Sequence, residues 1–103
     1  MKVEIGAFDT LPRDRGIRIT LGDERIAMFR VGDEVFAIGD TCSHAEASLA
    51  EGEVFDHDVE CPRHGSEFDL RTGKALSLPA TRPVPTYEVV IEDGVVYLVL
   101  EGS

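Results

Sequence analysis

Residues 42–64 read CSHAEASLAEGEVFDHDVECPRH, and both ends of this stretch carry one cysteine and one histidine. The first end is Cys42-Ser43-His44 and the second is Cys61-Pro62-Arg63-His64, with sixteen residues between His44 and Cys61. These two ends use both cysteines and two of the three histidines of the chain. Thiolate and imidazole are the ligands that proteins use for zinc and for iron–sulfur clusters. The spacing therefore predicts a metal site whose ligands are Cys42, His44, Cys61 and His64.

The distribution of these ligands favours a binuclear iron cluster. Zinc fingers mostly pair cysteine with cysteine and histidine with histidine, whereas each segment here offers one of each. In a cluster with two irons, each segment can give its thiolate to one iron and its imidazole to the other. One iron then has two thiolate ligands and the other has two imidazole ligands, which is the Rieske arrangement. A structural zinc module is the alternative interpretation of the same four residues.

The rest of the sequence predicts short β-strands joined by tight turns. Apolar segments bounded by turn residues cover 17–21, 26–29, 35–38, 87–91 and 95–100. Asp93-Gly94, between the last two segments, is the strongest hairpin signal in the chain. Helix signals are weak, and only residues 8–14 fit a short helical turn. These patterns predict an all-β fold.

Residues 40–80 differ from the segments around them. They are rich in glycine, proline, histidine and acidic residues, and their apolar runs are brief. A long irregular stretch inside a compact domain usually has a functional reason. We expect a small subdomain at about 40–80, inserted between the hairpins of a larger antiparallel β sandwich or barrel. A chain of 103 residues fits one domain, 1–103.

The charge of the chain excludes one class of partner. Twenty acidic residues against ten basic ones give a net charge of −10, whereas binding to nucleic acid needs basic contacts to phosphate. No apolar run approaches the roughly 18 residues of a membrane helix, and the N-terminus shows no signal region. We therefore expect a cytoplasmic protein with no membrane partner. The charge serves solubility or steers the chain toward a basic surface on another protein, with the acidic stretch 46–58 as the candidate docking surface.

The chain resembles Rieske ferredoxins, in particular the ferredoxin components of bacterial non-haem iron oxygenase systems. Besides the ligand segments, the resemblance is carried by residues 48–52 (SLAEG), 65–66 (GS), 68–69 (FD), 72–76 (TGKAL), 78–80 (LPA) and 83–87 (PVPTY). It implies a Rieske-type antiparallel β sandwich or barrel with a small cluster-binding subdomain at one tip. It also implies one 2Fe–2S cluster per chain, histidine ligands at the surface, and a third loop at Pro79-Ala80 that covers the cluster.

Departures from the wider family point to one branch of it. Rieske proteins of respiratory and photosynthetic complexes carry an extra cysteine in each ligand loop, and these two cysteines form a disulfide. Ala47 and Arg63 stand at those positions here. The same proteins raise their potential with a serine and a tyrosine hydroxyl, and here Ser66 matches the serine whereas Phe68 replaces the tyrosine. The resemblance therefore implies the oxygenase-ferredoxin branch, with a potential toward the low end of the Rieske range.

These observations predict an electron carrier and not an enzyme. Four protein ligands leave no open position on either iron, and the sequence shows no nucleophile–base motif or phosphate-binding loop. The resemblance implies a ferredoxin reductase as the electron donor and a terminal oxygenase of a dioxygenase system as the acceptor. The small Rieske-like subunit of a nitrite reductase and a redox helper of iron–sulfur cluster assembly are alternatives. His57 is expected to be a solvated turn residue and not a ligand, because its position does not fit the ligand spacing.

Overall fold

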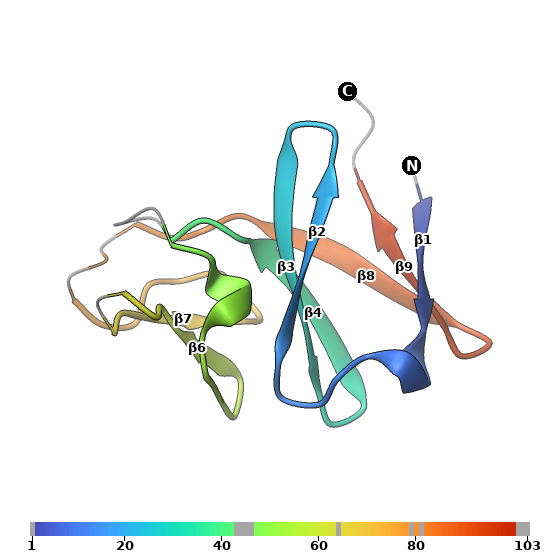
Figure 1. Ribbon diagram of the computed structural model, residues 1–103, viewed down its shortest axis with the longest axis horizontal. Helices are drawn as coiled ribbons and strands as arrows, with labels where there is room; N and C mark the ends of the chain where they lie inside the picture. Colours follow the sequence, from blue (N-terminus) through green and yellow to red (C-terminus); the bar gives the residue numbers. More distant parts are fainter. Residues whose placement is uncertain (1, 43–46, 64, 79, 81, 101–103) are drawn as a thin grey trace.

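The structure is a computed structural model, and it describes residues 2–42, 47–63, 65–78, 80 and 82–100. The larger of its two sheets has six strands in the order β1-β9-β8-β4-β3-β2 (Figure 1). These strands are β1 (Lys2–Ala7), β2 (Gly16–Leu21), β3 (Glu24–Val31), β4 (Glu34–Gly39), β8 (Thr86–Glu92) and β9 (Val95–Val99). Each strand is antiparallel to its neighbours. The all-β prediction is confirmed.

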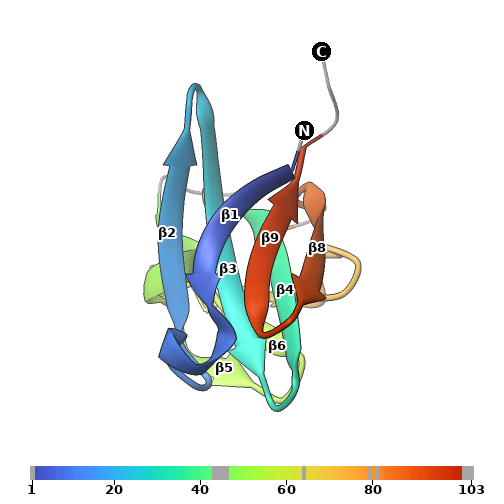
Figure 2. The same cartoon turned by 90° about the vertical axis from the view of Figure 1, so that its right-hand side faces the viewer.

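The large sheet is curled and its two halves are joined by a short seam. Only two residue pairs, Ala37↔Tyr87 and Ile38↔Thr86, connect β4 to β8. On one side of this seam lie β2, β3 and β4, and on the other side lie β8, β9 and β1 (Figure 2). Apolar residues from both halves, including Ile26, Met28 and Leu98, form one buried core. The edge strands β1 and β2 do not pair with each other. This part of the molecule is therefore an open, curled sheet whose two halves pack against each other through their side chains.

The second sheet is small and lies at the end of the molecule away from both termini (Figure 1). Its strands are β5 (Val54–Phe55), β6 (Asp58–Glu60) and β7 (Glu67–Asp69), in that order and antiparallel. The 3₁₀-helix η2 (Leu49–Glu51) leads into it. The short strands agree with the brief apolar runs predicted for residues 40–80.

Strand β3 explains how the two parts hold together. Its residues 26–30 are all buried, so this part of the strand has no solvent face. Because side chains alternate across a strand, Ile26 and Met28 enter the core of the curled sheet, whereas Ala27 and Phe29 enter a second core. That second core also contains Leu49 of η2 and Phe68 of β7. The uninterrupted apolar run at 26–29 is therefore the sequence signature of a strand between two cores.

Two glycines mark contacts that leave no room for a side chain. A Cβ built on Gly16 of β2 would lie 2.8 Å from the backbone of Ala50 in η2. A Cβ built on Gly52, which ends η2, would lie 2.0 Å from the carbonyl oxygen of Glu60 in β6. Real side chains do not approach this closely, so β2, η2 and β6 pack backbone to backbone.

Most of the predicted turns and strands are present in the structure. The Asp93-Gly94 turn has φ of 51° and 75°, the two left-handed positions of a tight hairpin turn. The helical turn expected within 8–14 is the 3₁₀-helix η1 (Phe8–Thr10). Strand β1, which pairs with β9, is not among the predicted segments. In the described part of the chain, no helix has the length and apolar character that crossing a membrane requires.

Candidate metal centre

The two predicted ligand segments form loops with the same backbone closure. In the first loop, Thr41 pairs with Ser48 in an antiparallel bridge, and the N–H of Cys42 donates to the carbonyl of Ala47 at 3.0 Å. In the second loop, Glu60 pairs with Glu67, and the N–H of Cys61 donates to the carbonyl of Ser66 at 2.7 Å. Each cysteine is therefore the first residue inside a closed loop, at the same place relative to the closing bridge.

Both cysteines are buried in the same apolar core. The exposed fraction is 4% for Cys42 and 0% for Cys61, and the two belong to one packed cluster with Leu49, Val59 and Phe68. They are not joined in a disulfide. Two buried thiols on matching loops, directed into one core from two segments, fit the donor set of a cluster with one thiolate from each loop.

The predicted histidine ligands lie outside the described residues. His44 belongs to 43–46, and His64 is likewise not described. The structure thus brings Cys42 and Cys61 into one core, while the assignment of all four residues, Cys42, His44, Cys61 and His64, as cluster ligands stays a prediction. Within the described part of the chain, no group of three or more His, Cys, Asp or Glu side chains could hold a metal ion.

The second loop contains a glycine that its turn requires. Gly65 has φ of 76°, a conformation that favours glycine strongly over residues with a Cβ. Its N–H donates to the carbonyl of Cys61 at 3.0 Å. This turn brings the chain back so that Ser66 can accept the hydrogen bond from the Cys61 N–H.

Ser66 connects the second loop to a third segment. Its side chain is fully buried, and its hydroxyl oxygen accepts a hydrogen bond from the N–H of Ala80 at 3.1 Å. Nearby, the hydroxyl oxygen of Ser77 accepts from the N–H of Glu67 at 2.9 Å. Ala80 is buried in the same core as the two cysteines. These contacts agree with a third loop at the predicted place, although Pro79 itself lies outside the described residues.

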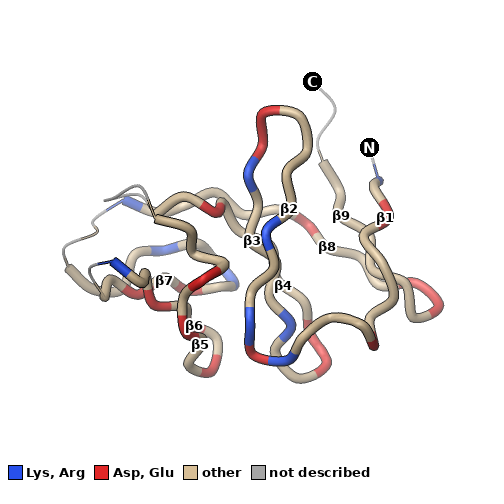
Figure 3. Tube along the Cα trace, viewed as in Figure 1, with Lys and Arg blue, Asp and Glu red and all other residues tan. Residues whose placement is uncertain are grey.

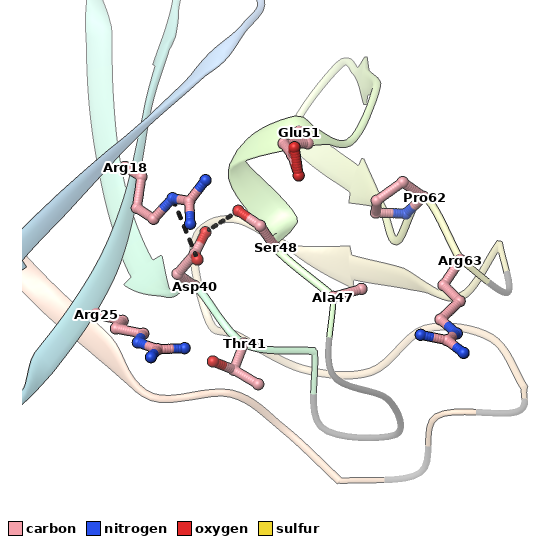
Figure 4. Close-up of a pocket in the computed structure, with 9 residues that line it drawn as sticks. All are labelled: Arg18, Arg25, Asp40, Thr41, Ala47, Ser48, Glu51, Pro62 and Arg63. Atoms are coloured by element: carbon pink, nitrogen blue, oxygen red, sulfur yellow. Dashed lines mark hydrogen bonds and ion pairs between the residues drawn. The ribbon is translucent and has the colours of Figure 1, made fainter.

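A buried carboxylate holds the base of the first loop. Asp40 is 3% exposed, and its Oδ1 accepts from the Ser48 hydroxyl at 2.7 Å (Figure 4). The same oxygen accepts from the Ala50 N–H at 3.0 Å. Oδ2 of Asp40 lies 4.0 Å from Nε of Arg18 on β2. A buried carboxylate needs such partners because its desolvation is otherwise expensive. Asp40 therefore ties the loop to η2 and to the curled sheet.

Sequence reasoning did not single out Asp40, and the sequence offers little signal for it. The chain has twenty acidic residues, so one aspartate beside a ligand loop does not stand out. Its partners lie 8, 10 and 22 positions away in the sequence, and only the fold brings them together.

His57 lies in a turn, as predicted. It follows β5, and its Nε2 is 3.4 Å from a carboxylate oxygen of Glu34 at the start of β4. Its ring meets the ring of Phe36 edge-on, with centroids 5.7 Å apart. His57 thus packs the small sheet against the β3–β4 hairpin.

Tyr87 lies on β8, close to the start of β3. Its hydroxyl donates to Oε2 of Glu24 at 2.7 Å. Burial, followed by this hydrogen bond, raises the pKa of Tyr87 to about 12. The pair joins the two halves of the curled sheet near the seam between β4 and β8.

Comparison with known proteins agrees with the resemblance seen in the sequence. A family model described as the Rieske 2Fe–2S domain matches residues 1–88. A 3-phenylpropionate/cinnamic acid dioxygenase ferredoxin subunit from Photorhabdus laumondii is 50% identical over 86 residues, which cover 82% of each chain. An anthranilate 1,2-dioxygenase ferredoxin subunit from Burkholderia cepacia is 46% identical over 90 residues, or 87% of this chain and 83% of that one.

Solved structures show the same relationship. The ferredoxin of carbazole 1,9a-dioxygenase from Nocardioides aromaticivorans has a TM-score of 0.93 at 32% identity, covering 98% of this chain and 99% of that one. A ferredoxin in complex with the oxygenase of carbazole 1,9a-dioxygenase has a TM-score of 0.89 at 36% identity, covering 94% and 91%. A protein from Mycobacterium tuberculosis described as an NADH-dependent nitrite reductase small subunit has a TM-score of 0.90 at 26% identity, covering 100% and 97%.

The family match spans most of the chain, and the dioxygenase ferredoxin subunits share about half of its aligned residues. The zinc interpretation of the four ligand residues has no support among these findings. The chain therefore belongs to the Rieske 2Fe–2S domain family, and its cofactor is a 2Fe–2S cluster.

Proposed function

We propose that this chain is the ferredoxin component of a ring-hydroxylating dioxygenase system. It accepts one electron from a ferredoxin reductase and passes it to a terminal non-haem iron oxygenase. The observation that carries the proposal is the pair of matching loops whose buried cysteines, Cys42 and Cys61, share one core. The names of the most similar relatives, which are dioxygenase ferredoxin subunits, support the same role.

Within this proposal, the ligands are Cys42 and His44 from the first loop and Cys61 and His64 from the second. A Rieske cluster supplies one-electron redox chemistry at about −150 to +300 mV, above the roughly −400 mV of plant-type ferredoxins. The residues of this chain exclude water and fix the loops. Leu49 and Phe68 pack beside the cysteines, Asp40 anchors the first loop, and Ser66 joins the second loop to Ala80.

The carrier role also needs the chain to meet two partners in turn. We infer that the reductase and the oxygenase use the end of the molecule that carries the ligand loops, since electron transfer requires a close approach to the cluster. We further infer a cytoplasmic location and one domain over 1–103, with the cluster-binding subdomain at about 40–80. The exposed acidic side chains of Glu53 and Asp56 offer one docking surface for a basic partner.

A nitrite reductase small subunit is the second candidate, because one such protein shares the fold. Its identity to this chain is 26%, whereas the dioxygenase ferredoxin subunits reach 46% to 50%. The difference favours the dioxygenase system. No observation on the structure favours a role in cluster assembly.

The direct experiment is reconstitution of the electron path. Purified anaerobically, the chain should contain two irons and two labile sulfides. Added to a ferredoxin reductase with NADH and to the purified oxygenase component of the Photorhabdus laumondii relative's system, it should support substrate-dependent NADH consumption. Oxygenase turnover that is the same with and without the chain would contradict the proposal. Turnover only with the catalytic subunit of a nitrite reductase would favour the second candidate.

A further inference from the structure

An open groove of about 800 Å³ lies beside the first ligand loop (Figure 4). Arg18 of β2 and Arg25 of β3 line one side of it, and Arg63 of the second ligand loop lines the other. Thr41 and Ala47 lie between them, one from each end of the first ligand loop. The groove therefore joins the curled sheet to both ligand loops.

Three arginines around one groove are unexpected in this chain. The sequence has only ten basic residues against twenty acidic ones, and Figure 3 shows acidic positions on many of the turns. The other charged residues lining the groove are Asp40 and Glu51. The side chain of Asp40 is only 4% exposed, and its oxygens face Ser48, Ala50 and Arg18, so Glu51 is the only exposed carboxylate among the described lining residues.

Two of the arginines have no acidic partner in the described part of the chain. Arg18 lies 4.0 Å from Asp40, but no ion pair is present at Arg25 or Arg63. Both are exposed. Figure 4 shows their guanidinium groups on opposite sides of the first loop, with Thr41 between. A guanidinium presents a planar set of N–H donors that matches a carboxylate, so this arrangement suits an anion that reaches both sides.

We propose that this groove binds a carboxylate-bearing surface segment of the terminal oxygenase, with Arg25 and Arg63 as its main contacts. The inference rests on the proposed function and names the contact chemistry of one partner. The chain as a whole has a net charge of −10, which repels an acidic segment. The arginine groove is therefore the favoured binding site for such a segment. Complementary charge at such a contact raises the association rate and fixes the orientation of the encounter. Because both ligand loops line the groove, a segment bound there brings the oxygenase against the cluster end.

The first test is the second-order rate constant for electron transfer from the reduced chain to an oxygenase. The acceptor is the purified oxygenase component of the Photorhabdus laumondii 3-phenylpropionate/cinnamic acid dioxygenase. We expect Arg25→Gln and Arg63→Gln each to lower the rate constant by about threefold to tenfold at low salt. The loss should shrink at about 1 M salt, where the Debye length is about 3 Å. Arg63→Lys should recover part of the rate, because it restores the charge without the planar donor set.

Arg15→Gln is the matched control. Arg15 is an exposed arginine outside the groove, and its substitution changes the net charge by the same amount. We expect this variant to keep its rate within about twofold of the original. The reduction potential should stay the same in Arg25→Gln and Arg15→Gln, which separates docking from a change in the cluster. Arg63 lies next to His64, so the rate of Arg63→Gln is compared after correction for its own measured potential. Equal losses in Arg15→Gln and Arg25→Gln, or faster transfer after either groove substitution, would overturn the inference.

The second test uses a labelled hexaglutamate peptide and fluorescence anisotropy at low salt. Binding that is lost in Arg25→Gln and Arg63→Gln but kept in Arg15→Gln supports the groove as an acidic-segment site. Displacement of the peptide by free phosphate at equal ionic strength would instead show a small-anion site and would overturn the docking inference. If the original chain reduces no oxygenase, the proposed function fails, and the peptide result still decides the chemistry of the groove.

Discussion

The two ligand loops have the same backbone closure but different anchors. The first loop is held by a buried carboxylate, since Asp40 accepts hydrogen bonds from Ser48 and Ala50. The second loop lies between β6 and β7, and neutral hydroxyls join it to the next segment: Ser66 accepts from Ala80, and Ser77 accepts from Glu67. The first loop therefore depends on a charged group and its distant partners, whereas the second is mainly a feature of a local hairpin.

The largest effect should come from Cys42 and Cys61, the cysteines that stand at the same place in the two loops. Cys42→Ser and Cys61→Ser each remove a thiolate, and we expect each to lower the cluster content by more than about tenfold, because the loss of a ligand exceeds the 10–100-fold cost of losing a supporting contact. Iron and sulfide analysis of anaerobically purified protein measures this. Full cluster content in either variant would show that the loops are not equivalent as ligand donors.

The next effect concerns the contact between the segments that carry the loops. Gly52→Ala places a Cβ 2.0 Å from the Glu60 carbonyl oxygen, and we expect the free energy of unfolding to fall by about 3 kcal/mol. Urea denaturation of the protein measures this change. Gly32→Ala is the control, since a Cβ there meets nothing within 4 Å and only its φ of 61° is unfavourable, at about 1 kcal/mol. Equal losses of unfolding free energy in Gly52→Ala and Gly32→Ala would contradict the claim that η2 and β6 pack backbone to backbone at Gly52.

The difference between the anchors predicts unequal effects of their removal. Asp40→Ala leaves the buried donors of Ser48 and Ala50 without their acceptor, and we expect a loss of about 2–3 kcal/mol of unfolding free energy. Ser66→Ala leaves one buried donor, the Ala80 N–H, without its neutral acceptor, and we expect about 1 kcal/mol. Asp40→Asn keeps an acceptor oxygen and should fall between them. Thermal unfolding followed by circular dichroism provides the order of the three variants, and a larger effect at Ser66 than at Asp40 would reverse the comparison.

The smallest effect is a pH dependence at the seam between the sheet halves. The pKa of Tyr87 is about 12 in the folded chain, against 10.0 for a free tyrosine. The fold therefore favours the protonated phenol, and this contribution is complete below about pH 10 and is lost as the pH rises through about 12. We expect the unfolding free energy to decline more steeply over this range in the original chain than in Tyr87→Phe. Parallel curves for the two proteins would exclude Tyr87 as the cause.

Local sequence signals predicted most of the fold. Asp93-Gly94 marks a turn whose geometry depends on the residues at the turn, so the hairpin β8–β9 follows from it. The spacing of the cysteines likewise identified two segments that the structure places in one core. Strand β1 was missed because its pairing partner, β9, lies at the other end of the chain, so no local hairpin turn marks the pair.

The features that the sequence could not predict depend on distant contacts. Asp40 becomes an anchor only because η2 and β2 come to it, and Gly52 matters only because β6 passes against it. The arginine groove also joins residues from three separate segments, around Arg18, Arg25 and Arg63. Neither residue type nor local spacing indicates such groupings, since each arises from the packing of the two sheets.

The central claim is that each loop gives one thiolate and one imidazole to the same 2Fe–2S cluster. Pulsed electron paramagnetic resonance of the reduced protein, grown with ¹⁵N-histidine, tests it directly. We predict couplings to two histidine nitrogens, the loss of one coupling in His44→Cys and of the other in His64→Cys, and no change in His57→Gln. A spectrum without histidine coupling, or one that changes with His57 and not with His64, would contradict the account.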